Sequence, residues 1–392
     1  MAERPRILLV TRNLPPLIGG MERLNWHMAQ ELARRGEVCI VGPVGSAALA
    51  PEGVKVVEVP LKPLWKFLAS AFFEAFKLAR RWRPHIVLAG SGLTALPAWL
   101  TARSVNARAA AYAHGLDMAV PHPVYRGLWF PALRRMECVI ANSEATRVLA
   151  MSAGVVASRI RIVHPGVQLP KLPDSDATNS FRAEHGLGDA LLLLSVGRLS
   201  TRKGLREFVT QALPRIVQAI PQAMLVVVGD APSNALHAGA QTIDSIKAAA
   251  AEAGVAGHLR FLGQITDYGK LGVVYGAADV HVFPVRELPG DPEGFGMVAV
   301  EAAAHGLPTV AFATGGVTDA VAEGQSGHLV KAGDYEALAD AVIRMLTSGA
   351  EPGQECRAFA RRFAWDVFGE GVANALSLDG KARPVSVSGT EG

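Results

Sequence analysis

Two glutamates surround a glycine-rich turn in the second half of the chain. Glu293 and Glu301 enclose seven residues, beginning Gly-Phe-Gly-Met, and the pattern predicts a helix over Met297–Ala304. Gly294 and Gly296 let the main chain approach a ligand closely, and the free N–H groups at a helix start favour a phosphate. Carboxylates accept hydrogen bonds from pairs of hydroxyl groups. The segment suits a phosphate flanked by sugar and ribose hydroxyls, although two ordinary helix-flanking glutamates would show the same spacing.

Basic residues follow another predicted strand. Gly197 ends a strand over 191–196, and Arg198, Arg202 and Lys203 come before the next predicted helix. Arginine and lysine can hold a diphosphate and stabilise the negative charge that develops on a departing nucleotide. This stretch therefore suits the phosphate half of the same site, with a solvated basic turn as the alternative.

A glycine pair follows the first predicted strand. Gly19 and Gly20 lie in Leu-Pro-Pro-Leu-Ile-Gly-Gly-Met-Glu, before a predicted helix over 21–35. Such a loop can face a phosphate, but the pair alone is also typical of a plain turn. The segment does not match Gly-x-Gly-x-x-Gly, and no acidic residue completes a dinucleotide fingerprint, so NAD binding is not favoured.

Alternating strands and helices must position these loops. Apolar runs of strand type recur between helical stretches in both halves of the chain, which is typical of parallel sheets with helices on both faces. Such sheets place their ligand-binding loops after the strands. The predicted strands are 6–10, 37–41, 54–59, 86–89, 108–113, 138–141, 161–163, 191–196, 224–229, 258–262, 279–282, 309–313 and 328–330.

The length of 392 residues exceeds one ordinary domain. We expect a Rossmann-like domain over 1–170, a proline-punctuated linker over 171–188 and a second Rossmann-like domain over 189–364. A C-terminal helix over 365–378 is expected to return to the first domain, and the tail over 379–392 is expected to be disordered.

Composition narrows the class of protein. Hydrophobic residues make up 50% of the chain, charged residues 19%, and the formal net charge is +4. The chain can bury two cores, and its positive charge favours anionic partners. Nucleic acid is not favoured, because there is no zinc finger, RNP-like strand or long basic run. Three scattered cysteines and a first apolar run too short for an export signal favour a cytoplasmic protein.

Together these segments resemble glycosyltransferase family 4, a family of retaining, nucleotide-sugar-dependent glycosyltransferases with the GT-B fold. The resemblance covers nearly the whole chain, and the two glutamates with seven residues between them are its most specific element. It implies two doubly wound parallel-sheet domains facing each other across a cleft, the first for the acceptor and the second for the donor. The residue roles that it implies are pyrophosphate binding by Arg198 and Lys203, donor-sugar contact by Glu293, ribose contact by Glu301, and close approach to the diphosphate and sugar at Gly19 and Gly20. Backbone N–H groups of Phe295, Gly296 and Met297 would complete the donor site, to which Gly197 also belongs.

Further positions match the family less specifically. His114 ends a predicted strand where the family often has a histidine near the reacting sugar, whereas a single histidine is otherwise usually structural. Asn142 matches a position at the cleft, or it caps the next helix. The residues that match the place where main chain meets the nucleobase are Arg260, Phe261 and Leu262.

We expect neither a metal nor a cofactor. Asp174 and Asp176 form an Asp-x-Asp triplet, but it lies in the predicted linker. Arg198, Lys203 and a helix N-terminus can neutralise a leaving diphosphate without a metal ion.

The segment 62–83 mixes aromatic and basic residues at helical spacing. Its six lysines and arginines face one acidic residue, Glu74, which is typical of a helix lying on an anionic membrane surface. The alternative is an ordinary helix with a solvated basic face. Its core stripe would then consist of Leu68, Phe72, Phe76 and Ala79.

We therefore expect transfer of a hexose-type sugar from a UDP- or GDP-sugar to a hydroxyl group of a lipid-linked or cell-envelope glycan acceptor. The family implies retention, and the setting would be lipopolysaccharide or polysaccharide biosynthesis in the cytoplasm, at the inner face of the cytoplasmic membrane. Two alternatives stay open: a GT-B epimerase or phosphorylase acting on the nucleotide sugar, and a non-catalytic partner of a glycan assembly system.

Overall fold

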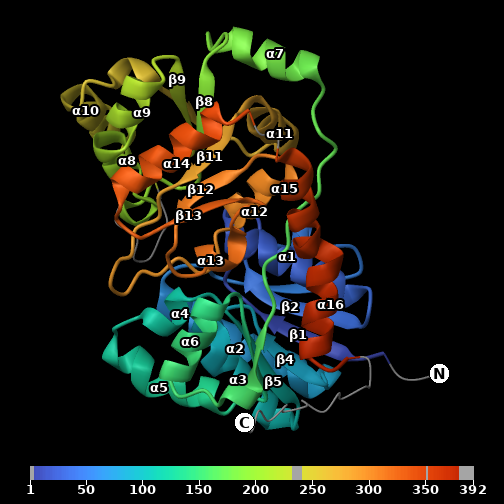
Figure 1. Ribbon diagram of the computed structural model, residues 1–392. Helices are drawn as coiled ribbons and strands as arrows, with labels where there is room; N and C mark the ends of the chain where they lie inside the picture. Colours follow the sequence, from blue (N-terminus) through green and yellow to red (C-terminus); the bar gives the residue numbers. More distant parts are fainter. Residues whose placement is uncertain (1–3, 232–240, 350–351, 379–392) are drawn as a thin grey trace, which may run out of the picture.

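Two α/β domains stand one above the other in the computed structural model (Figure 1). The structure describes residues 4–231, 241–349 and 352–378, and the predicted tail over 379–392 lies outside them. Each domain is built on one sheet, and neighbouring strands pair in parallel throughout the described residues. This is the doubly wound, two-domain architecture that the sequence predicts.

The described N-terminal sheet has the strand order β3-β2-β1-β4-β5-β6-β7. The order reverses between β1 and β4, and open α/β sheets bind ligands beyond the carboxyl ends of their strands at such a switch point. The strands are β1 Arg6–Val10, β2 Glu37–Pro43, β3 Lys55–Val59, β4 Ile86–Ala89, β5 Arg108–Ala113, β6 Cys138–Ala141 and β7 Ile160–Ile162.

Alternate side chains of β1 serve two separate cores. Leu8 and Val10 are buried against α2, α3, α5 and α6, whereas Ile7 and Leu9 are buried on the other face, against α1 and α16. A strand that is apolar on both faces fits a sheet covered on both faces. The helices of this domain are α1 Gly20–Ala33, α2 Leu64–Trp82, α3 Ala95–Val105, α4 Leu116–Ala119, α5 Pro123–Arg134 and α6 Glu144–Ser152, with short 3-10 turns at η1 Ala47–Leu49, η2 Gly92–Thr94 and η3 Ala157–Arg159.

The described C-terminal sheet repeats the same plan, in the order β10-β9-β8-β11-β12-β13. Its switch point lies between β8 and β11. Leu193 of β8 is buried with α8, α9, α10 and α14, while Leu192 and Leu194 are buried with α11 and α12 on the opposite face. The strands are β8 Leu191–Val196, β9 Ala223–Val228, β10 Leu259–Gly263, β11 Val280–Phe283, β12 Thr309–Phe312 and β13 Gly327–Val330.

Helices of the C-terminal half cover this sheet and reach back to the first domain. The bounds are α7 Ser175–Glu184, α8 Leu205–Gln211, α9 Leu213–Ala219, α10 Ile243–Glu252, α11 Tyr268–Ala277, α12 Met297–Ala304, α13 Val317–Ala320, α14 Tyr335–Thr347, α15 Gly353–Ala360 and α16 Trp365–Ala375, with η4 Thr201–Lys203, η5 Ala256–His258 and η6 Arg361–Phe363.

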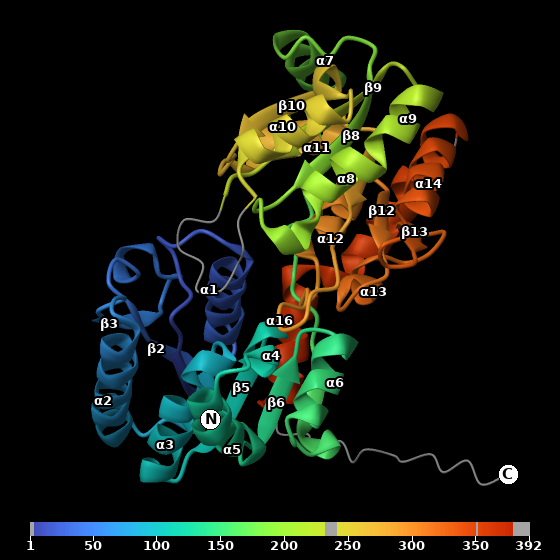
Figure 2. The same ribbon diagram turned by 90° about the vertical axis from the view of Figure 1, so that its left-hand side faces the viewer.

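The chain crosses between the domains at two neighbouring places. The main-chain N–H of Val167 donates to the carbonyl of Phe363 at 2.7 Å, and Val167 also forms a bridge with Ala364. Beyond the second crossing, α16 packs along α1 in the N-terminal domain, and both views show them side by side (Figures 1 and 2).

The predicted linker over 171–188 is wrong in its centre, because Ser175–Glu184 forms α7, which packs on α11. Asp174 caps this helix by accepting a hydrogen bond from the N–H of Ala177 at 2.8 Å. Arg182 donates to the carbonyl of Ala277 at 2.8 Å and so ties α7 to the second domain. None of the residues of α7 is buried. Hydrophobic periodicity therefore gave no signal of this helix.

Helix α2 packs on the N-terminal sheet through one phenylalanine and three alanines. Trp65 is 71% exposed and Phe73 is 62% exposed, so neither belongs to the core. In the described part of the chain, no helix combines the length and apolar character needed to cross a membrane. The buried stripe consists of Phe67, Ala71, Ala75 and Ala79. Of the expected core stripe only Ala79 belongs to it, because Leu68, Phe72 and Phe76 each lie one position after a buried residue.

Candidate active site

Loops from the switch points of both sheets meet where the domains touch. Gly20 follows β1 in the first domain, and Met297 begins α12 in the second. A Cβ added at Gly20 would come within 3.2 Å of the sulfur of Met297, so these segments are in close contact. Gly19 is also confined, because an added Cβ would lie 2.3 Å from a carboxylate oxygen of Glu22. The structure thus places the glycine pair opposite the start of α12.

A cluster of largely buried charges lies in the loops after β8 and β11. Nζ of Lys203 is 2.8 Å from Oε2 of Glu293, and Nε of Arg202 is 3.4 Å from the same oxygen. Arg202 also pairs with Asp291 at 3.1 Å. The side chains of Glu293 and Lys203 are only 11% and 18% exposed. Including the nearby Arg198, three cations face two carboxylates, and this excess of positive charge suits a diphosphate.

The ionisation of Glu293 is set by these neighbours. Burial alone would raise the pKa of the Glu293 carboxyl, but Lys203 and Arg202 outweigh burial and hold the pKa at about 2. Burial lowers the pKa of the Lys203 ammonium, and Glu293 opposes that shift. Nζ of Lys203 also lies 4.5 Å from the ring centroid of Phe283, in cation-π contact. Glu293 is therefore an anion at neutral pH.

The glycine-rich turn after Glu293 packs directly against the N-terminal domain. A Cβ added at Gly294 would lie 2.8 Å from Nδ2 of Asn142 and 3.3 Å from the carbonyl oxygen of His114. A Cβ added at Gly115, whose φ is +62°, would lie 3.2 Å from Cα of Gly294. The absence of side chains at both glycines therefore allows His114 and Asn142 to sit beside the loop that carries Glu293.

Hydrogen bonds fix the orientation of the buried His114 ring. Nε2 lies 3.0 Å from the carbonyl oxygen of Gly90. A carbonyl can only accept, so Nε2 carries a proton and Nδ1 of the neutral ring is an acceptor. Burial lowers the pKa of His114, against the opposing effect of Asp117. Oδ2 of Asp117 accepts from the main-chain N–H of His114 at 3.0 Å, which holds this turn in place. The neutral ring can accept a hydrogen bond from a hydroxyl group.

Asn142 does not cap helix α6. Ser143 is the N-cap, because its Oγ accepts from the N–H of Thr146 at 3.1 Å. Asp319 of the C-terminal domain also reaches this helix end, where its Oδ2 accepts from the N–H of Glu144 at 2.7 Å. The side chain of Asn142 is thereby left at the domain contact, beside Gly294.

Glu301 has a partner that the sequence analysis did not identify. Arg23, in the first turn of α1, forms an ion pair with Oε1 of Glu301 across the domain contact. The hydroxyl of Tyr275 lies 3.4 Å from the other carboxylate oxygen. The signal available in the sequence was an arginine one turn after the Gly19-Gly20 pair, but its partner lies 278 residues away.

The other predicted residues have mixed surroundings. Gly296 has φ +95° at the N-cap of α12, a conformation that favours glycine. The ring of Phe295 is 2% exposed and stacks on His164 at 5.3 Å, so its side chain belongs to the core and only its main chain suits a ligand. Gly197, φ +142°, directly follows β8 and precedes the exposed Arg198.

The predicted nucleobase segment lies on β10, at the edge of the C-terminal sheet. Arg260 bends back to the carbonyl of Leu259 at 3.1 Å, and Phe261 and Leu262 are half-buried against the two cores of their domain. Their side chains thus have structural surroundings. A nucleobase could therefore bind to main-chain N–H and carbonyl groups at the end of β10.

Metal ligands do not gather within the described residues, where no three His, Cys, Asp or Glu side chains form a group that could hold an ion. The Asp-x-Asp triplet has a structural place instead, since Asp174 caps α7.

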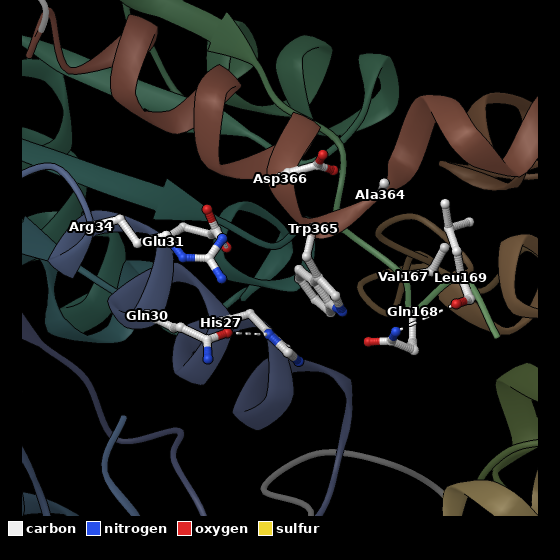
Figure 3. A pocket seen from close by; sticks show the side chains of 10 residues that line it. All are labelled: His27, Gln30, Glu31, Arg34, Val167, Gln168, Leu169, Ala364, Trp365 and Asp366. Atoms are coloured by element: carbon white, nitrogen blue, oxygen red, sulfur yellow. Dashed lines mark hydrogen bonds and ion pairs between the residues drawn. The ribbon is translucent and has the colours of Figure 1, made fainter. Parts of the chain in front are cut away.

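A cavity of about 270 Å³ lies at the domain crossings rather than at the charge cluster (Figure 3). Helix α1 provides one wall, and both crossing segments provide the others. Figure 3 shows the rings of His27 and Trp365 facing each other, with centroids 3.9 Å apart. Burial is the main cause that lowers the pKa of His27 to about 4, which keeps this ring neutral in the stack at neutral pH. The lining residues are His27, Gln30, Glu31, Arg34, Val167, Gln168, Leu169, Ala364, Trp365 and Asp366.

Comparison with known proteins agrees with this arrangement along most of the chain. The family described as Glycosyltransferase Family 4 matches residues 18–170, and the family described as Glycosyl transferases group 1 matches residues 177–363. The first match covers the N-terminal sheet from β2 onward, and the second covers the C-terminal sheet.

Relatives and solved structures of similar length extend the likeness. The GDP-mannose-dependent alpha-(1-6)-phosphatidylinositol monomannoside mannosyltransferase of Mycolicibacterium smegmatis is 29% identical, over 96% of this chain and 100% of the relative. The D-inositol 3-phosphate glycosyltransferase of Xylanimonas cellulosilytica is 28% identical, over 97% of this chain and 98% of the relative. The crystal structure of Anabaena HepE in complex with UDP and glucose superposes with a TM-score of 0.78 at 21% identity, covering 95% of this chain and 99% of that one. The chain belongs to glycosyltransferase family 4 and is a glycosyltransferase of the GT-B fold.

Proposed function

We propose that this glycosyltransferase moves a hexose-type sugar from a nucleoside diphosphate sugar to an acceptor hydroxyl, with retention at the anomeric carbon. The observation that carries the proposal is the buried cluster in which Lys203 lies 2.8 Å from Glu293, with Arg202 beside them, at the switch point of the C-terminal sheet. A sugar diphosphate presents a hydroxyl-rich ring next to two phosphates. A cluster in which the cations outnumber the carboxylates matches both halves, because the carboxylate of Glu293 can bind hydroxyl groups and the cations can bind phosphates.

The proposed reaction exchanges two bonds on the same face of the sugar. The bond between the anomeric carbon and the diphosphate oxygen breaks, and the acceptor oxygen forms its bond from the side that the diphosphate leaves. The acceptor proton passes to the leaving phosphate oxygen, so the products are the glycoside and the nucleoside diphosphate. Lys203 and Arg198 would stabilise the charge that develops on the phosphate. Glu293 would hold the sugar and the positive charge on its ring.

The nucleobase of the proposed donor is either uracil or guanine. The name of the Mycolicibacterium relative specifies GDP-mannose, and the HepE structure contains UDP. In this chain the proposed base contact is main chain near Arg260, Phe261 and Leu262, and a carbonyl or N–H does not reveal the base from residue type. We therefore propose a UDP- or GDP-sugar as the donor.

The acceptor is proposed to be a glycan or lipid-linked molecule that reaches the N-terminal domain from an anionic membrane surface. Trp65 and Phe73 expose large apolar rings on α2, in the same helix as the exposed Lys66, Arg80 and Arg81. Exposed aromatic rings next to basic side chains are the composition of helices that lie in a membrane interface. The enzyme would then work at the inner face of the cytoplasmic membrane.

The test is to incubate the purified protein with a panel of UDP- and GDP-sugars. The released nucleoside diphosphate is measured, and the product that contains the sugar is identified. The proposal predicts slow release of diphosphate with one donor, accelerated by acceptor, and a glycoside of retained configuration. Conversion of the nucleotide sugar to an epimer, or to a sugar phosphate in the presence of phosphate, would contradict transfer. Binding of nucleotide with no turnover under any condition would support a non-catalytic partner instead.

A further inference from the structure

One ion pair joins the two proposed halves of the active site. Arg23 belongs to the helix that follows Gly19 and Gly20 in the N-terminal domain, and Glu301 belongs to α12 of the C-terminal domain. The side chains are 23% and 12% exposed, so the pair is largely shielded from water. Shielding strengthens the attraction between the charges and makes the loss of either partner costly.

Both oxygens of the Glu301 carboxylate are oriented by protein groups. Oε1 receives the Arg23 guanidinium, and Oε2 lies 3.4 Å from the hydroxyl of Tyr275. Tyr275 is itself held, since it is 1% exposed and its ring stacks on His305 at 4.7 Å. The Arg23 guanidinium also lies 5.8 Å from the ring centroid of Tyr268, at the start of α11. The carboxylate is therefore fixed from helix α11 of its own domain and from helix α1 of the other.

A carboxylate fixed in this way still has capacity for a ligand. Its two oxygens offer about four acceptor positions. Arg23 and Tyr275 occupy two of them. The remaining positions suit two adjacent hydroxyl groups, provided that the carboxylate does not rotate. Only Arg23 contributes a positive charge among these two partners, and it comes from the other domain.

We infer that Arg23 is a positioning residue for donor recognition: it fixes the Glu301 carboxylate toward the ribose diol of the nucleotide from across the domain contact. This inference rests on the proposed function. Recognition of ribose by the C-terminal domain is then complete only when the N-terminal domain is in place. The first turn of α1 thus connects the glycine pair, which precedes Arg23, to the carboxylate of Glu301.

The experiment measures discrimination between nucleotides with and without the diol. Dissociation constants of UDP, GDP and their 2′,3′-dideoxy forms are determined by calorimetry for the wild type, Arg23→Gln, Arg23→Lys and Glu301→Gln. Hydrogen bonds to a charged group contribute enough for the wild type to prefer the ribose form by about tenfold or more. In Arg23→Gln this preference should fall to about threefold or less, because a carboxylate that can rotate forms weaker hydrogen bonds with the ribose hydroxyls. Arg23→Lys should recover part of the preference, because it keeps the positive charge.

A matched control separates positioning from the mere loss of a domain contact. Asp319→Asn weakens a different contact between the domains, at the N–H of Glu144, without touching Glu301. This variant should keep the wild-type preference for the ribose form. If Asp319→Asn and Arg23→Gln lose the preference equally, the effect belongs to domain contact in general and the inference is overturned.

A double variant covers the case in which Arg23→Gln is poorly folded because a buried carboxylate has lost its partner. Arg23→Gln/Glu301→Gln removes both charges, and its preference should equal that of Glu301→Gln alone. A further loss in the double variant, or a wild-type ratio in Arg23→Gln, would overturn the inference. If the wild type binds the ribose and the dideoxy nucleotides equally, the inference is also overturned. Sugar transfer would then still be tested separately, by the release of nucleoside diphosphate. Failure of the wild type to bind UDP or GDP at all would contradict the proposed function as well.

Discussion

Nζ of Lys203 lies 2.8 Å from Oε2 of Glu293, although 90 residues separate the two in the sequence. The pair is largely buried, and a buried charge that loses its partner typically costs about 3 to 5 kcal/mol. We expect Glu293→Gln to remain folded but to lose about 3 kcal/mol of unfolding free energy, because Lys203 is left without its anion. Lys203→Met/Glu293→Gln should recover most of this loss. Urea unfolding measures it, and equal stability of wild type and Glu293→Gln would contradict the assigned pair.

Acid should weaken the same cluster over a defined range. The pKa of Glu293 is held at about 2 in the folded protein, below its ordinary value of 4.5. Between these values the unfolded chain takes up a proton that the folded chain does not, so stability falls as the pH falls from 4.5 toward 2. Above pH 4.5 Glu293 contributes no pH dependence. Urea unfolding at several pH values should therefore show the stability difference between wild type and Glu293→Gln shrinking below pH 4.5, and a difference that stays constant would count against the depressed pKa.

His114 should act as a neutral residue. Burial lowers its pKa from 6.5, so the ring carries no charge near neutral pH. His114→Ala should reduce turnover by about tenfold, the size expected for the loss of one hydrogen bond from a hydroxyl group to the ring. The pH profile of wild-type kcat between 6 and 8 should show no step from this ring. A limb with an apparent pKa near 6.5 that disappears in His114→Ala would show that the ring titrates and would refute this assignment.

The exposed rings of α2 should determine membrane binding. Trp65→Ser/Phe73→Ser should lower the affinity for anionic phosphatidylglycerol vesicles by about tenfold or more, because each ring buries apolar surface in the interface. Val156→Ser is the control, since Val156 is a 56% exposed apolar residue outside α2. Vesicle flotation measures the bound fraction. Equal flotation of the wild type and the double variant would remove the reason for placing the acceptor at a membrane.

The sequence was informative where local physics decides the structure. Runs such as Leu191–Val196 are apolar at nearly every position because helices cover both faces of the sheet, so the predicted strand positions agree closely with the structure. Helix α7 gave no such signal, because it has no fully buried residue and is held by the half-buried Phe181 together with hydrogen bonds of Asp174 and Arg182. In α2, the large apolar residues Trp65 and Phe73 are exposed while alanines are buried, so residue size alone did not identify the buried side.

The candidate site shows the same division. The glutamates, the basic residues and the glycines could each be found from spacing, because their chemistry is local to one loop. The Arg23 and Glu301 pair could not, since only the packing of one domain on the other brings these residues together. Likewise, the sequence suggested that Asn142 might cap a helix, but Ser143 takes that place and leaves Asn142 beside Gly294.

The most direct test of the account is the rate at which nucleoside diphosphate is released from a panel of UDP- and GDP-sugars by the wild type and by Glu293→Gln. We predict release with at least one donor by the wild type, and a decrease of about a hundredfold or more in a folded Glu293→Gln protein, because stabilisation of transition-state charge is lost. Equal release by the two proteins would contradict the central place of Glu293 in this active site.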